Sequence, residues 1–190
     1  MPYTKSKTIA ERAAWDYVNS PEGSELELST VLPNWVFGPV LSEDFSPSIR
    51  LVQRLLNGDL PGCPDLTLGV VDVRDLASLQ LLVMTRPEAA GQRFLAISPP
   101  SVTVKQVAMI LKERLPNASK KVTTRQLPSF LLRIVAFFDQ EIATVAPILG
   151  KKGDSTSEKA RRILGWEPMS KEDALVATAE SLIKLGLVKK

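Results

Sequence analysis

The feature of this sequence that most constrains its fold is the scarcity of strand-like segments and the long stretches between them. Three segments have the β-branched and apolar content typical of strands: LELSTV at 26–31, LGVVDV at 68–73 and RFLAIS at 93–98. Strands with buried faces need partners on both edges, and segments so few and so far apart supply them poorly to one another. We therefore expect an α/β chain that corresponds to the C-terminal part of a longer protein whose first half held most of the sheet.

The remaining segments favour helices joined by turns. Apolar residues at three- and four-residue spacing predict helices over residues 4–18, 48–56, 75–84, 103–115, 128–138, 157–164 and 171–185. In the first of these we expect the apolar stripe to pack in a core. Asp75 is expected to be the N-cap of its helix. Between the first two strand segments, LPNWVFGPVL at 32–41 predicts a loop because it contains Pro33, Gly38 and Pro39. The predicted chain is helix-rich, with a few short strands.

Composition excludes several classes of function. The sequence has 24 Lys and Arg against 21 Asp and Glu, and these charges are scattered, which gives little support to nucleic-acid binding. Cys63 is the only cysteine and there is no histidine, so disulfides, Cys/His metal sites and histidine-based triads are excluded. No apolar run reaches the roughly 18 residues of a membrane span. We expect a cytoplasmic protein without a metal site, whose chemistry depends on Tyr, Lys, Ser or carboxylates.

The first seven residues, MPYTKSK, contain one such pair. Tyr3 and Lys7 are four residues apart, so on a helix both side chains lie on one face. Tyrosine is a weak acid at neutral pH, but an ammonium group one turn away favours the phenolate and makes proton exchange with a substrate oxygen feasible. Tyr3 and Lys7 are therefore candidates for acid–base catalysis of a reaction at a carbonyl or an alcohol group.

Tyr3 to Lys7 resembles the YxxxK element of the extended short-chain dehydrogenases/reductases, and three further stretches match this family in order. LPNWVFGP resembles the loop after the sixth strand, VVDVRDLA resembles the strand-to-helix element at the start of the substrate region, and STSEKARRILGWEP resembles the C-terminal LGW-x-P signature. The resemblance covers essentially the whole chain. It is strongest to the bacterial aldehyde and dihydroflavonol reductase-like members, in the group of NAD-dependent epimerases and dehydratases.

The resemblance implies the C-terminal part of a Rossmann-type reductase that uses NADP or NAD. Tyr3 would exchange the proton of the substrate oxygen, and Lys7 would assist it and bind the nicotinamide ribose. The loop residues implied to line the nicotinamide are Pro33, Val36, Gly38 and Pro39. Residues 1–40 would be the remnant of the dinucleotide-binding domain and 41–190 mainly the substrate domain. The family's glycine-rich pyrophosphate turn, G-x-G-x-x-G, does not occur in this sequence.

Three functions remain open at this stage. The favoured one is reduction of a small aldehyde or ketone, with this chain inactive unless the dinucleotide-binding half is supplied. A nucleotide-sugar epimerase or dehydratase is the second, but residues 41–65 are mainly apolar and have only Arg50 and Arg54 to clamp a diphosphate. The third is a non-enzymatic interaction module. The resemblance also implies dimerisation through residues 4–18, and exposed apolar faces would favour self-association of the isolated chain.

Overall fold

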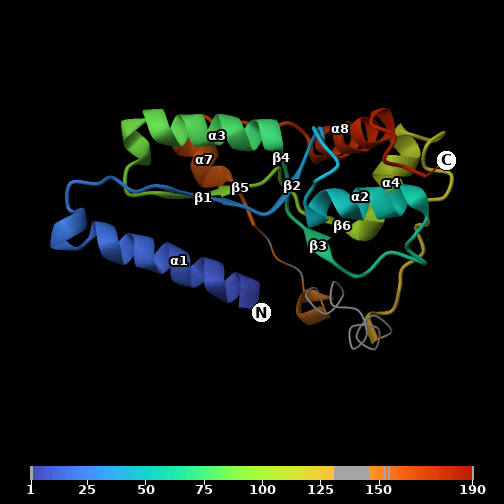
Figure 1. Cartoon of the computed structure of the whole chain (residues 1–190), viewed down its shortest axis with the longest axis horizontal. Coiled ribbons are helices and arrows are strands. Elements are labelled where there is room, and N and C mark those ends of the chain that lie inside the picture. The colour runs from blue at the N-terminus through green and yellow to red at the C-terminus, as the bar shows by residue number, and fades with distance from the viewer. Residues whose placement is uncertain (1, 131–145, 152, 154, 190) are drawn as a thin grey trace.

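The computed structural model describes residues 2–130, 146–151, 153 and 155–189 (Figure 1). Its helices are α1 (Pro2–Val18), α2 (Pro47–Asn57), α3 (Val73–Thr85), α4 (Val104–Arg114), α7 (Glu158–Leu164) and α8 (Lys171–Lys184), with short 3-10 turns η1 (Pro21–Gly23), η2 (Pro87–Ala89) and η3 (Ala146–Ile148). Its strands are β1 (Thr30–Pro33), β2 (Trp35–Phe37), β3 (Thr67–Leu68), β4 (Val70–Asp72), β5 (Arg93–Ala96) and β6 (Val102–Thr103). The helix predicted at 128–138 falls mostly outside the described residues.

The strands form pairs instead of one continuous sheet. Among the described residues, β1 pairs with β5 and β2 with β4 in parallel, and β3 pairs with β6 in antiparallel orientation. Each strand therefore has one hydrogen-bonding edge without a strand partner in this part of the chain. This arrangement confirms the prediction of a helix-rich α/β chain whose few strands do not make a sheet by themselves.

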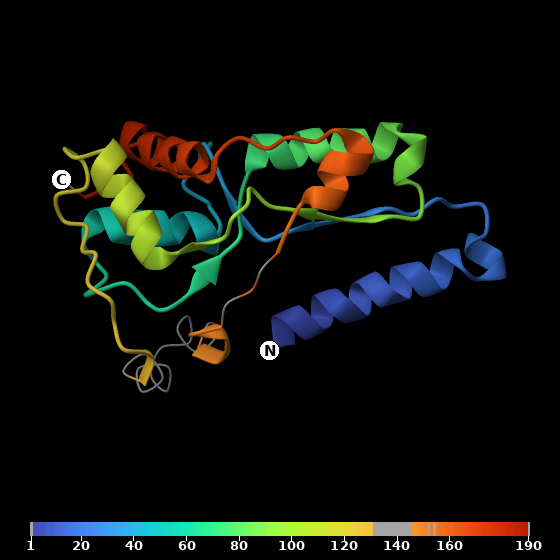
Figure 2. The ribbon, with the colours of Figure 1, turned by 180° about the vertical axis from the view of Figure 1, so that it is seen from behind.

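Two hydrophobic cores lie side by side along the molecule (Figures 1 and 2). The large core is formed chiefly by the inward faces of α2, α4 and α8, and the small core by α3, β5 and α7. The β2–β4 pair lies between them. Side chains alternate along a strand, so each face of this pair contributes to one of the cores. Phe37 and Val70 belong to the large core, whereas Val71 is buried in the small core and Val36 packs against it.

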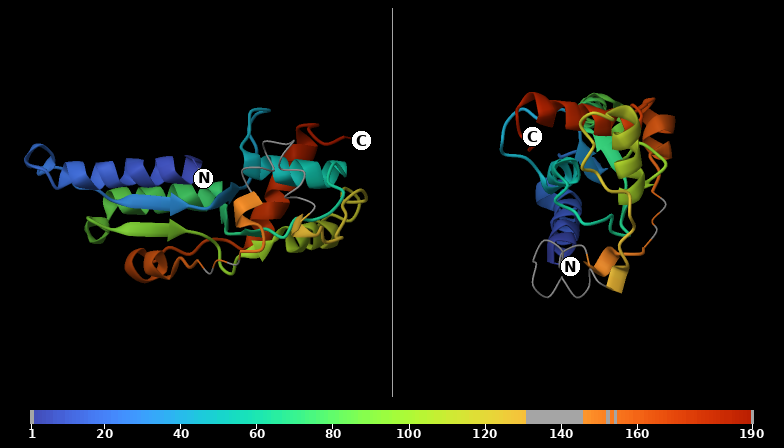
Figure 3. Two further views of the ribbon diagram at one scale, coloured as in Figure 1. Left: turned by 90° about the horizontal axis from the view of Figure 1, so that it is seen from below. Right: turned by 90° about the vertical axis from the view of Figure 1, so that its right-hand side faces the viewer.

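Helix α1 lies outside both cores. Figures 1 and 3 show it running along the β1–β5 pair at the edge of the molecule. Ile9 and Tyr17, two residues of its predicted core stripe, are 54% and 53% exposed. The expectation of core packing is therefore wrong for most of this stripe, in which only Ala14 and Val18 are partly buried. Exposure of the stripe agrees with the second expectation, that the isolated chain presents an apolar face to water.

The local predictions for the strands and the loop need three corrections. The first strand forms at Thr30–Pro33 and not at 26–31, because its register is set by pairing with β5, where Thr30 lies opposite Arg93. The predicted loop contains strand β2. The segment LGVVDV is split at Gly69 into β3 and β4, whose partners are different strands.

The N-cap of α3 is Asp72, not Asp75. The Asp72 carboxylate is fully buried, accepts a hydrogen bond from the backbone N–H of Arg74 at 2.8 Å, and forms an ion pair with the Arg74 guanidinium. Asp75 lies in the first turn and accepts a hydrogen bond from the backbone N–H of Met169 at 2.9 Å. Its burial raises its pKa above the usual value. Both aspartates are thus structural.

Candidate functional site

Tyr3 and Lys7 lie on one face of α1, as the spacing predicts. Lys7 Nζ is 5.6 Å from the centre of the Tyr3 ring, which is within the range of a cation–π contact. Tyr3 is 74% exposed, so its hydroxyl is open to a substrate. The first turn of α1 is at the end of the helix that lies farther from the β1–β5 pair (Figures 1 and 2). A phenol, an ammonium group and free access are therefore present together at this point.

Glu11, two turns along α1, ties the helix to the β1–β5 pair. Its carboxylate accepts hydrogen bonds from Arg93 Nε at 2.7 Å and Nη2 at 3.0 Å, and another from Thr30 Oγ1 at 3.0 Å. The bond from Arg93 is the main cause that lowers the pKa of Glu11 from 4.5 to about 2. Glu11 therefore sets how the helix that bears Tyr3 and Lys7 sits against the strands.

The four loop residues implied to line the nicotinamide are not all brought together. Val36, Gly38 and Pro39 line a cavity of about 210 Å³ at the surface, with Val40, Phe45 and Val73 among the other lining residues. Pro33 is exposed at the end of β1 and does not line this cavity. Tyr3 and Lys7 do not line it either. The structure thus gives two separate parts of a candidate site, one on α1 and one at the loop.

Gly38 is the most constrained residue of the loop. Its φ is 120°, and a Cβ at this position would lie 2.9 Å from Val73 Cγ1 and 3.1 Å from both carboxylate oxygens of Asp72. Any side chain would therefore be strained by the backbone conformation and would also overlap the start of α3. The glycine that the family resemblance indicated is required here by both conditions.

Two hydroxyl groups of α8 hold the same loop, and sequence reasoning missed both. The N–H of Gly38 donates to Thr178 Oγ1 at 2.6 Å, and the N–H of Val40 donates to Ser181 Oγ at 2.9 Å. Their spacing of three residues places them on one face of α8. No local signal could have identified them, since they lie about 140 residues from the loop in sequence.

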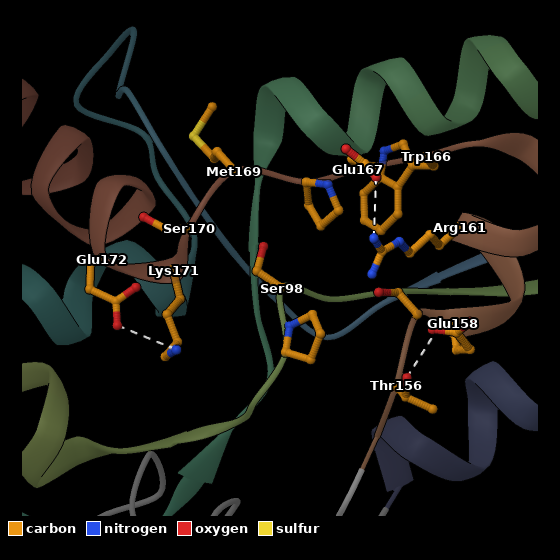
Figure 4. Close-up of a pocket in the computed structure, with 13 residues that line it drawn as sticks. Ser98, Thr156, Glu158, Arg161, Trp166, Glu167, Met169, Ser170, Lys171 and Glu172 are labelled. Atoms are coloured by element: carbon orange, nitrogen blue, oxygen red, sulfur yellow. Dashed lines mark hydrogen bonds and ion pairs between the residues drawn. The ribbon is translucent and has the colours of Figure 1, made fainter.

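A second cavity, of about 350 Å³, lies between the end of β5 and the segment that joins α7 to α8 (Figure 4). Ser98 contributes a buried hydroxyl that has no hydrogen-bond partner among the described residues. The charges around the cavity are paired in part, with Lys171 Nζ 3.3 Å from Glu172 and Arg161 Nη2 3.5 Å from Glu167. Opposite charges are mixed in its lining, so the cavity does not select one ligand charge.

Trp166, from the LGW-x-P stretch, anchors the wall of this second cavity. Its ring is 2% exposed and belongs to the small core, and its Nε1 donates to the Asp75 carbonyl at 3.0 Å and to Ser78 Oγ at 3.2 Å. Trp166 is therefore a core residue. Its role in this structure is to attach the α7–α8 segment to α3.

The described part of the chain offers neither a metal-binding group nor a membrane-spanning helix. Within these ranges no three His, Cys, Asp or Glu side chains are grouped so that they could hold a metal ion. None of the helices the structure describes has the length and apolar character needed to cross a bilayer.

Comparison with known proteins relates this chain to a set of reductases. No family model matches the sequence. Over 96% of its length the chain is 35% identical to an NADPH-dependent methylglyoxal reductase of Saccharomyces cerevisiae, of which it covers 51%. Over 60% of its length it is 30% identical to a dihydroflavonol 4-reductase of Gerbera hybrida, of which it covers 30%.

The structural comparison agrees with the sequence comparison. The yeast methylglyoxal/isovaleraldehyde reductase in complex with NADPH superposes with a TM-score of 0.75 at 25% identity, over 97% of this chain and 51% of that structure. The chain spans about half the length of the curated relatives it matches across most of its own length, and the matched half is their C-terminal portion. With the ordered YxxxK, loop and LGW-x-P stretches, these similarities relate the chain to the C-terminal part of the extended short-chain dehydrogenases/reductases.

Proposed function

We propose that this chain, joined to a dinucleotide-binding half, forms an NADPH-dependent reductase that reduces a small aldehyde or ketone to an alcohol. One observation carries the proposal: the 35% identity to an NADPH-dependent methylglyoxal reductase extends over 96% of the chain. The exposed Tyr3–Lys7 pair supports it, because it supplies the acid–base chemistry that carbonyl reduction requires.

The residues of this chain would carry the proton part of the reaction. NADPH, when bound, supplies the hydride that adds to the carbonyl carbon. The Tyr3 hydroxyl donates its proton to the carbonyl oxygen, which becomes the alcohol, and Tyr3 is left as the phenolate. The Lys7 ammonium, on the same helix face, would stabilise that phenolate and hydrogen-bond the nicotinamide ribose.

The loop contributes Val36, Gly38 and Pro39 to the lining of the 210 Å³ cavity, and the absence of a side chain at Gly38 lets the loop lie against the start of α3. Pyrophosphate binding in this family requires a glycine turn that the sequence does not contain. We therefore expect this chain alone to bind NADPH weakly or not at all, and to act only with the complementary half.

The decisive experiment uses the two tyrosines of the chain. In a reductase assembled from this chain and the N-terminal half of the yeast relative, Tyr3→Phe should reduce turnover of methylglyoxal by about 10²- to 10⁴-fold, the usual contribution of a general acid. Tyr17→Phe is the matched control, because Tyr17 is also exposed on α1 but lies at its far end. The control should keep full turnover, and equal activity of the two variants would refute the assignment of Tyr3.

We further propose that copies of this chain associate through the exposed stripe of α1. The stripe presents Ile9 and Tyr17 to solvent, and exposed apolar surface favours pairing between copies. Light scattering should show mass increasing with concentration, and Ile9→Glu should reverse this. Met84→Glu, on the surface of α3, is the control and should leave association unchanged. A strict monomer at all concentrations would rule out this interface.

A further inference from the structure

The two hydroxyl groups of α8 that hold the loop can act toward it only as hydrogen-bond acceptors, because each already donates its proton within α8. Thr178 Oγ1 donates its own proton to the Ala174 carbonyl at 2.9 Å, and Ser181 Oγ donates its proton to the Thr178 carbonyl at 2.8 Å. Such bonds to the preceding helical turn fix the orientation of a hydroxyl group. The oxygen lone pairs that remain face the N–H groups of Gly38 and Val40.

These two bonds hold both sides of Pro39, which has no N–H of its own. Gly38 precedes it and Val40 follows it, so every backbone donor of the three-residue segment is bound by α8. Thr178 is fully buried, and its bond to Gly38 is therefore shielded from water. An N–H left unpaired at this depth would destabilise the loop. The loop thus has one strongly preferred position relative to α8.

The opposite side of Gly38 is closed by the start of α3. A Cβ there would overlap Val73 and the Asp72 carboxylate, so the loop backbone is held between α3 and α8. Phe37, immediately before it, is 1% exposed and anchors the loop in the large core. The segment that lines the 210 Å³ cavity is consequently held by the start of α3, by Phe37 and by the α8 hydroxyls. Of these three contacts, only the hydroxyls can be removed without changing the packing.

We propose that Thr178 and Ser181 are positioning residues for the reductase site: they hold the Gly38–Val40 segment in the conformation that faces the nicotinamide. This inference rests on the proposed function, because it assigns the loop to the cofactor. Neither residue touches the reacting atoms. Their effect would be on the affinity for NADPH rather than on the chemical step, since they act through the shape of the loop.

The positioning claim is tested on this chain alone, by amide hydrogen exchange followed by NMR. Thr178→Val keeps the shape of the side chain but removes its acceptor, and it should speed exchange at Gly38 by roughly tenfold or more. Thr178→Ser keeps the hydroxyl and should restore slow exchange. Ser181→Ala should speed exchange at Val40, and it replaces Thr178→Val if that variant does not fold. Amides of β5 should be unaffected in every variant.

The link to the cofactor is tested in the assembled reductase. Thr178→Val should raise the KM for NADPH by roughly tenfold and change kcat by less than about threefold, and Thr178→Ser should return KM to the wild-type value. Unchanged exchange at Gly38 and Val40 would overturn the positioning claim. Faster exchange with an unchanged KM would overturn the link to NADPH. A wild-type assembly without turnover would refute the proposed function, while exchange would still decide whether the hydroxyls position the loop.

Discussion

Helix α1 and the loop at residues 38–40 carry the two parts of the candidate site, and they are held in different ways. The α1 part is exposed, and Glu11 attaches it through polar contacts to Arg93 and Thr30 at the edge of the molecule. The loop part lies between two helices, with Gly38 buried and Pro39 and Val40 partly buried, and is held by hydrogen bonds to Thr178 and Ser181.

The difference separates the residues proposed to take part in the reaction, which lie on α1, from the residues that maintain the fold around the loop. Tyr3 and Lys7 make few stabilising contacts, so changing them should alter a reaction and leave folding nearly unchanged. Gly38 has little freedom on any side, so changing it should affect folding directly. Each of the following predictions tests one side of this separation.

The largest expected effect is on the α1 side. Lys7→Met in the assembled reductase should lower turnover by about 10²-fold and weaken NADPH binding, because the proposed assistance to Tyr3 and the proposed ribose contact are both lost. Lys5→Met is the matched control, because Lys5 is also exposed on α1 but two residues from Tyr3 and so on a different face. Urea unfolding should be the same for both variants and the wild type. A large loss of stability in Lys7→Met would contradict the separation.

The next effect is on the loop side and appears in the free energy of unfolding. Gly38→Ala should destabilise the chain by about 2–4 kcal/mol, from strain at positive φ together with overlap with Val73 and Asp72. Gly91→Ala is the control, because Gly91 also has positive φ, 69°, but a Cβ there meets nothing within 4 Å. It should cost only about 1 kcal/mol. Equal urea midpoints for the two variants would mean that the loop is free to move away from α3.

The smallest effect is the pH dependence of the α1 attachment. The pKa of Glu11 is lowered from 4.5 to about 2 in the folded chain, so its contribution is present above pH 4.5 and is lost as the pH falls toward 2. Because Arg93 is more than half exposed, we expect this contribution to be about 1 kcal/mol or less. The NMR signal of the Trp15 indole N–H, which lies 3.5 Å from Glu11, should shift across that range.

Two variants on α1 separate Glu11 from other carboxylates in this titration. Glu11→Gln should abolish the shift of the Trp15 signal and give the acid-like spectrum at pH 7. Asp16→Asn, at an exposed position on the same helix, should leave the shift in place. Persistence of the shift in Glu11→Gln would show that α1 is attached in another way.

Prediction from sequence succeeded where the signal was local. The helices α1, α2, α4, α7 and α8 form within one or two residues of their predicted ranges, because periodicity and capping act over a few neighbouring residues. The strand ends were predicted less well. Pairing with β5 decided where β1 begins, and the choice between Asp72 and Asp75 as N-cap depended on burial of the carboxylate. The exposure of the α1 stripe could not be predicted either, because the spacing of apolar residues identifies one face of a helix but not what packs against that face.

By itself, the sequence determined the Tyr3–Lys7 pair, the loop glycine and the order of family stretches, because each depends on residues that are neighbours along the chain. Only the tertiary structure decided that Thr178 and Ser181 face Gly38 and Val40, and that Glu11 meets Arg93. The physical reason is that a buried N–H or a carboxylate is satisfied by whichever group the packed fold brings near it, and that group can lie anywhere in the sequence.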